Sequence, residues 1–138
     1  MLHARLTPSQ LYTRVDLDAR IEGSSGTELT GICFDALIGA LGRAAHAAGR
    51  GDRRDAVDGL ARAASVLGSL QRSVDEQAEM GGVLIDFYGS ISARLRDLMK
   101  QPDEQEVAAL RVDVAEVAAA MIPKTASRQP TNALAGAP

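Results

Sequence analysis

Apolar residues recur at intervals of three and four positions along most of this chain of 138 residues. This spacing gathers side chains on one face of an α-helix. The longest such pattern covers residues 25–48 and opens with Ser25 and Glu28, which have the three-residue spacing of a capping box. One apolar stripe along it consists of Leu29, Ile32, Cys33, Ala36, Leu37, Ala40, Leu41 and Ala44, and a second stripe consists of Phe34, Ile38 and Ala45. An outer helix of a small bundle needs only about three apolar positions in two turns. The helix predicted over residues 25–48 has more, so it is either buried nearly all round or retains apolar surface for another chain.

Two further segments show the same periodicity in the middle of the chain. The first follows the helix-capping residue Asp52 and precedes a turn predicted around residues 73–77. Its apolar stripe consists of Ala56, Leu60, Ala63, Leu67, Leu70 and Val74. The second segment contains Gly81 and Gly82 in its first turns. Its stripe consists of Leu84, Phe87, Tyr88, Ile91, Leu95 and Leu98.

A last amphipathic segment begins at the cap pair Asp103 and Glu106 and ends at Pro123. Its apolar positions alternate between intervals of three and four residues, and they are Val107, Leu110, Val114, Val117 and Met121. Long amphipathic helices joined by short turns pack as antiparallel neighbours. We therefore predict an all-α fold, an antiparallel up-down four-helix bundle over residues 27–122.

The two ends of the chain differ from this bundle. Residues 1–26 contain the helix-start pattern Thr-Pro-Ser-Gln at residues 7–10, followed by an apolar side made of Leu11, Tyr12 and Val15. This pattern predicts a short extra helix. Residues 123–138 are small, polar and interrupted by proline, so we expect a disordered tail that buries too little apolar surface to offset its ordering entropy.

Composition narrows the class of protein. Aromatic residues make up only 3% of the chain and Trp is absent, so alanine and leucine fill the interior, as suits closely spaced helices. The net charge of −3 provides no basic footprint for nucleic acid or an anionic membrane. No stretch reaches the length of a membrane span, about 18 apolar residues, and the N-terminus lacks an apolar run of signal-peptide length. Cys33 is the single cysteine, which favours a reducing compartment. We therefore predict a soluble, cytosolic protein that binds neither nucleic acid nor membrane.

Few residues suggest chemistry. His46 invites a phosphotransfer role, but it lies one turn before the break at Gly49, and the cation Arg50 lies beyond the predicted helix end. Cys33 falls within the main apolar stripe, with no His or Lys following at helical spacing to lower its pKa, so we expect a small buried hydrophobe. Paired Glu-x-x-His elements of a di-metal bundle are absent. We predict no enzymatic activity, metal or cofactor, with phosphotransfer through His46 as the alternative.

Four short elements follow one another along the chain. They are a tyrosine segment beginning at Leu11, CFDAL at residues 33–37, GDRR at residues 51–54 and FYGSI at residues 87–91. Their order and spacing resemble those of the flagellar secretion chaperone family (FliS) over roughly residues 11–121. The family has Leu-Tyr-Asp-Gly-Ala where this chain has CFDAL. Phe34 therefore stands in the place of a tyrosine and retains its apolar contact without the phenol hydroxyl.

The resemblance implies a cytosolic flagellar export chaperone that binds the disordered C-terminal region of flagellin, prevents premature polymerisation and aids secretion. Amphipathic segments of such a client would lie in apolar grooves between helices. The residues implied in flagellin binding are Leu11, Tyr12, Val15, Ile32, Phe34, Asp35, Ile38, Phe87, Tyr88 and Ile91. The flagellar export apparatus and a second copy of this chain, in a weak homo-oligomer, are further candidate partners.

Two expectations concern where the binding surface lies. The short N-terminal helix should lie over one apolar groove and shift when the client binds. If Phe34 and Ile38 face outward, a charged residue at either position should abolish client binding at little cost in melting temperature. If they belong to the core, the same substitutions should lower the melting temperature instead.

Overall fold

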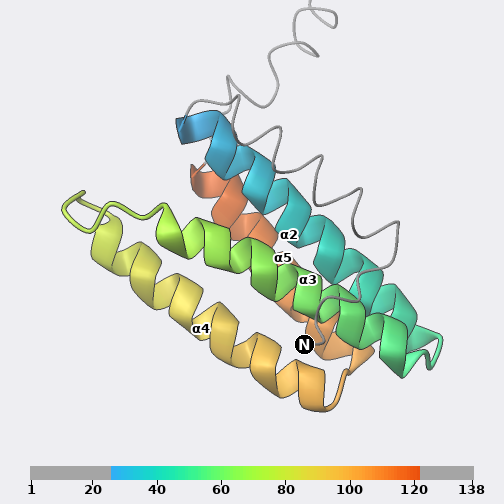
Figure 1. Ribbon diagram of the computed structural model, residues 1–138. Coiled ribbons are helices and arrows are strands. Elements are labelled where there is room, and N and C mark those ends of the chain that lie inside the picture. Colours follow the sequence, from blue (N-terminus) through green and yellow to red (C-terminus); the bar gives the residue numbers. More distant parts are fainter. Residues whose placement is uncertain (1–25, 122–138) are drawn as a thin grey trace, which may run out of the picture.

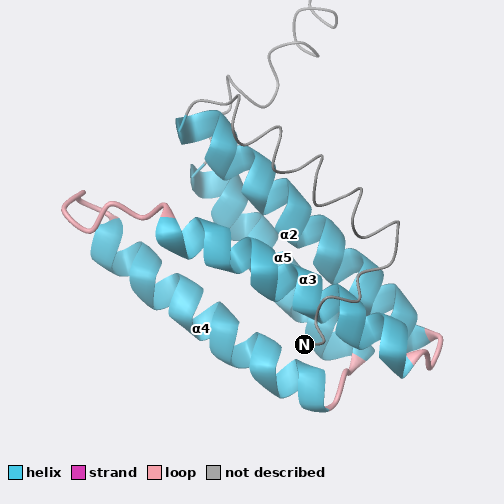
Figure 2. Ribbon diagram, in the orientation of Figure 1, coloured by secondary structure: helices cyan, strands magenta, loops and turns pink. Residues whose placement is uncertain are grey.

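Four α-helices make up residues 26–121, the part of the chain that the computed structural model describes, and this part contains no strand (Figures 1 and 2). The helices are α2 (Gly26–Gly49), α3 (Arg53–Arg72), α4 (Gly81–Lys100) and α5 (Glu104–Met121). The predicted all-α bundle is therefore confirmed. The short helix predicted within residues 1–26 and the tail predicted over residues 123–138 lie outside the described residues.

Local sequence chemistry sets two of the helix starts. The side chain of Asp52 accepts a hydrogen bond from the backbone N–H of Asp55 at 3.0 Å, and that of Asp103 accepts one from Glu106 at 2.9 Å. Both are N-terminal caps, which satisfy backbone donors that lack a partner within the helix. The backbone N–H of Asp55 and, after it, the guanidinium of Arg50 hold the pKa of the Asp52 carboxyl below its ordinary value. Both caps agree with the sequence prediction.

The connection between α3 and α4 is longer than predicted. The turn expected around residues 73–77 extends over residues 73–80. Val74, which the periodicity placed in the preceding helix, lies in this loop but still packs against the core. Gly81 and Gly82 lie in the first turn of α4, as predicted.

The four helices are not equally surrounded. α2 packs against both α3 and α5, whereas α4 packs mainly against α3 and runs along the edge of the bundle (Figure 1). An ion pair between the Arg94 guanidinium and the Asp113 carboxylate, 2.8 Å apart, joins α4 to α5. Both side chains are about half exposed, so this pair contributes less than about 1 kcal/mol. Apolar contact therefore holds α4 in place.

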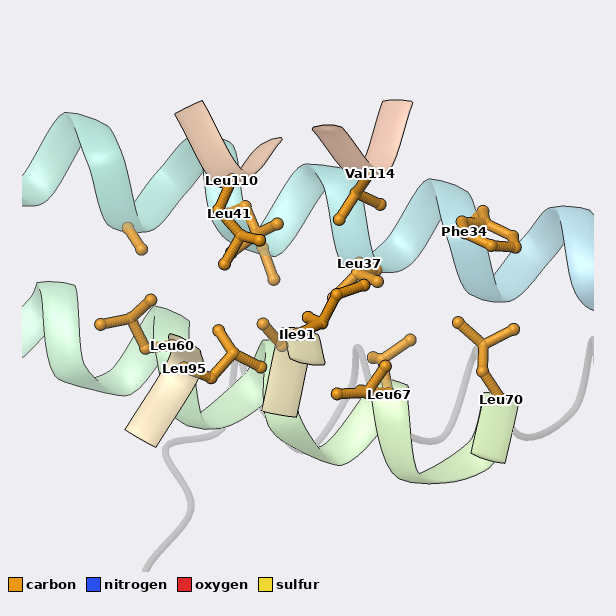
Figure 3. Packing of buried hydrophobic residues seen from close by; sticks show 14 of the residues in the cluster. Phe34, Leu37, Leu41, Leu60, Leu67, Leu70, Ile91, Leu95, Leu110 and Val114 are labelled. Carbon is orange, nitrogen blue, oxygen red and sulfur yellow. The ribbon is translucent and has the colours of Figure 1, made fainter. Parts of the chain in front are cut away.

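One continuous core runs between the helices (Figure 3). The side chains that meet in Figure 3 are Phe34, Leu37 and Leu41 of α2, Leu60, Leu67 and Leu70 of α3, Ile91 and Leu95 of α4, and Leu110 and Val114 of α5. No polar or charged side chain of the described residues is buried. The bundle is thus stabilised by apolar burial, which contributes roughly 25 cal/mol per Å² removed from water.

The structure corrects the outward placement considered for Phe34. Phe34 is 1% exposed, Tyr88 2% and Ile91 1%, so all three side chains belong to the core. The reason is that α2 packs against two neighbours, α3 and α5. These neighbours cover more of the circumference of α2 than a single apolar stripe occupies. Ile38 is only partly buried and packs at the edge of the core.

Candidate partner-binding surface

The start of α4 carries more apolar surface than the core covers. Met80, Val83 and Ile85 are 55%, 58% and 43% exposed, which is unusual for large hydrophobic side chains. Leu84 and Phe87 beside them are partly buried against the core. We call these five residues together the α4 apolar face; Met80, Val83 and Phe87 lie on one flank of the core stripe of α4, and Ile85 lies on the opposite flank. A clustered apolar surface of this kind is typical of sites that bind another protein.

An aromatic row links this face to the interior. The ring centroid of Phe87 lies 5.8 Å from that of Tyr88, which lies 6.3 Å from that of Phe34 on α2. Burial, with Cys33 as a smaller contributor, raises the pKa of the Tyr88 hydroxyl. The row passes from the buried rings of α2 and α4 to the half-buried ring of Phe87. Phe87 therefore contacts the buried ring of Tyr88, which in turn contacts the buried ring of Phe34.

Three further predicted binding residues lie on α2, whereas Ile91 lies in the core on α4 and Leu11, Tyr12 and Val15 lie outside the described residues. Ile32 and Ile38 are partly buried and Asp35 is exposed. Ile32 and Asp35 are three positions apart and share one side of the helix. The backbone carbonyl of Ile38 accepts a hydrogen bond from Arg111 Nε on α5 at 3.3 Å. The structure thus brings Phe34, Phe87 and Tyr88 together, and leaves Ile32 and Asp35 on a different face.

Sequence reasoning missed three residues of the α4 apolar face, namely Met80, Val83 and Ile85. It followed the core stripe through Leu84 and Phe87 and did not consider Met80 and Val83 before this stripe or Ile85 within it. A usable signal was present, because Val83, Leu84 and Ile85 are consecutive apolar residues. Consecutive residues on a helix point in directions about 100° apart, so one core cannot cover all three.

A second feature is a surface pocket of about 470 Å³ along the C-terminal half of α2. We call it the basic pocket, and it is lined by Gly39, Gly42, Arg43, His46, Arg50, Asp55 and Arg111. The guanidinium of Arg50 pairs with the carboxylates of Asp52 at 3.4 Å and Asp55 at 3.1 Å. His46 is exposed and lies one turn before the end of α2, as predicted. The approach of Arg111 from α5 was not predictable, because only the packing of α5 against α2 brings it there.

Two structural features are absent from the described residues. Within residues 26–121, no group of three or more His, Cys, Asp and Glu side chains lies close enough to hold a metal ion. None of the four described helices is long and apolar enough to cross a membrane.

Cys33 is a buried thiol, as the sequence predicted. It is 2% exposed, and burial raises its pKa above the ordinary value. Because the thiolate is the reactive form, we expect labelling of native protein by an aromatic disulfide reagent to be slower than labelling in guanidinium by on the order of a hundredfold or more. Rapid stoichiometric labelling of the native protein, followed by absorbance, would show that the thiol is accessible.

These observations define a class of protein before any comparison. A helical bundle that has one continuous core within its described residues, and which keeps an apolar face on an edge helix, has the architecture of a helical protein-binding module.

Comparison with known families makes the assignment specific. The family model described as "Flagellar protein FliS" matches residues 8–120. The match covers most of the chain, so this protein belongs to the FliS family, a family of flagellar export chaperones. No curated protein and no solved structure gives a match. The resemblance inferred from the sequence is confirmed, and family membership favours a chaperone function over phosphotransfer through His46.

Proposed function

We propose that this protein is a cytosolic chaperone that binds the C-terminal segment of flagellin, prevents its premature polymerisation and presents it for export. The observation that carries the proposal is the α4 apolar face, an exposed apolar surface on a FliS-family bundle that has one continuous core within its described residues. Delivery of the bound flagellin to a component of the export apparatus is part of the same proposal.

The α4 apolar face suits an amphipathic client segment. Met80, Val83 and Phe87 follow one another at intervals of three and four residues, so they lie along one line on the surface. A client helix that lays its own apolar side along this line removes both surfaces from water. Because the client segment orders as it binds, part of the contact free energy is lost to ordering, and tight binding requires an extended contact.

The predicted binding residues then take different roles. Phe87, Ile32, Asp35 and Ile38 have accessible surface and are proposed to contact the client. The buried side chains of Phe34, Tyr88 and Ile91 support the surface from the core. Leu11, Tyr12 and Val15 are proposed to lie over an apolar groove and to shift when the client binds.

The proposal is tested by titrating a flagellin C-terminal peptide into the full chain and measuring heat. The substitutions Val83→Glu and Ile85→Glu together should weaken binding by about tenfold or more, because they place charge on the apolar contact. Both side chains are exposed, so the melting temperature should stay close to that of the unchanged protein.

Val112→Glu is the matched control, because Val112 is 52% exposed but lies on α5. It should leave peptide affinity within about twofold of the unchanged protein. Removal of residues 1–22 should change the affinity while the bundle still unfolds cooperatively. Unaltered binding by the α4 double variant would contradict the proposed surface. Measurement of the molecular size of the client-free protein in solution distinguishes client binding by the α4 apolar face from self-association through it.

A further inference from the structure

The basic pocket concentrates cationic side chains on a chain that is acidic overall. The net charge of the protein is −3, yet Arg43, Arg50 and Arg111 line one pocket together with His46. Only one carboxylate, that of Asp55, is among the lining residues, and it already pairs with Arg50. Among the described residues, neither Arg43 nor Arg111 forms an ion pair. These two guanidinium groups are the candidate donors to an anionic ligand.

The floor of the pocket contains two glycines of α2, over which arginine side chains lie. Gly39 and Gly42 contribute no side chains there. The Arg111 side chain crosses from α5 over Gly42, where an added Cβ would lie 3.2 Å from Arg111 Nε. The hydrogen bond from Arg111 Nε to the carbonyl of Ile38, 3.3 Å long, holds the guanidinium over α2. The Arg111 side chain therefore lies over Gly42, and Arg43 Nη1 lies 3.7 Å from an added Cβ at Gly39, so both guanidinium groups border the pocket floor.

The arrangement fits a row of carboxylates better than a single anion. Arg43, His46 and Arg50 follow at intervals of three and four residues along one side of α2. At 1.5 Å per residue they span roughly 10 Å along the helix, so they do not converge on one point. Guanidinium groups bind carboxylates through two parallel hydrogen bonds. A row of this length therefore suits successive carboxylates of an extended peptide better than one small anion.

We propose that the basic pocket is a second docking site, separate from the α4 apolar face, and that it takes an acidic peptide segment of a partner protein. This site does not depend on flagellin binding. Its cations steer the acidic segment toward α2 and fix its position, while the apolar face on α4 remains free for a client.

The experiment measures fluorescence anisotropy of a short, labelled glutamate-rich peptide with the full-length protein. The same peptide with Gln in place of every Glu is the uncharged probe. The unchanged protein should bind the acidic probe saturably and the uncharged probe at least about tenfold more weakly. Arg43→Gln combined with Arg111→Gln should weaken binding of the acidic probe by about tenfold or more.

Arg96→Gln on α4 is the charge-matched control, because Arg96 is exposed and, within residues 26–121, its side chain hydrogen-bonds to Ser92 on its own helix. It should leave the affinity within about twofold. Gly39→Gln adds bulk to the floor without changing charge, and replacing glycine in a helix favours folding. It should also weaken binding of the acidic probe, which keeps the test decisive if the loss of Arg111 disturbs α5.

Four results would overturn the proposal. They are absence of binding by the acidic probe, an equal loss of binding in Arg96→Gln, full competition by inorganic phosphate, and stronger binding to anionic lipid vesicles than to the peptide. Flagellin-peptide binding measured on Arg43→Gln alone is expected to be unchanged, because Arg43 does not contact Ile38, whereas Gly39 and Arg111 both adjoin it. A failure of this site is thereby distinguishable from a failure of the chaperone proposal.

Discussion

Phe34→Asp is expected to unfold the bundle. The Phe34 side chain is 1% exposed and packs against the ring of Tyr88. Truncation of a buried phenylalanine to alanine costs about 3–5 kcal/mol, and a buried unpaired carboxylate adds several kcal/mol more. Domains of this size are stable by roughly 5–15 kcal/mol. The helical circular dichroism signal should therefore be lost, or should melt far below the transition of the unchanged protein.

Ile85→Asp is the control for this prediction. Ile85 is 43% exposed, so the same carboxylate there should shift the melting temperature little. A cooperative transition of Phe34→Asp near that of the unchanged protein would show that Phe34 is accessible. The expected unfolding also means that loss of client binding at Phe34 cannot identify a contact, whereas loss at Val83 and Ile85 can.

Gly81→Ala and Gly82→Ala are expected to change stability in opposite directions. An added Cβ at Gly81 would collide with the backbone carbonyl oxygen of Asp75 and would lie 3.1 Å from backbone atoms of Glu76. Because backbone atoms of a loop cannot rotate away as a side chain does, relief requires the loop to move, at a cost of about 1–3 kcal/mol.

The neighbouring glycine supplies the control. An added Cβ at Gly82 meets nothing within 4 Å, and alanine favours a helix over glycine by up to about 1 kcal/mol. Gly82→Ala should therefore raise the denaturation midpoint in guanidinium, while Gly81→Ala lowers it. Equal midpoints for the two variants would contradict the close approach of the loop to α4. Because this loop leads into Met80 and Val83, Gly81→Ala should also weaken client binding.

Much of the fold was predictable because its causes are local. The caps at Asp52 and Asp103 depend on a side chain and a backbone N–H three residues away. The start of α4 at the glycine pair also agrees with the prediction. The α3–α4 connection was predicted too short, because Val74 continues the apolar period although it lies in a loop that packs on the core.

The family resemblance was also accessible from sequence, since it depends on the order of short elements. The sequence did not show which of the predicted binding residues lie in the core and which lie on the surface. Phe34 and Tyr88 are adjacent in space although more than fifty positions apart in the chain. Helical periodicity states which residues share a face, and it does not state how many neighbours cover that face.

By itself, the sequence determined the helices, their caps, the apolar positions and membership of the FliS family. Only the tertiary structure decided that α2 has two close neighbours, which bury Phe34, and that edge-lying α4 retains its apolar face. It also decided that Arg111 of α5 lies over Gly42 of α2. The physical reason is the sequence separation over which each effect acts. Capping and periodicity act within a few residues, whereas burial and charge clustering depend on which distant segments pack together.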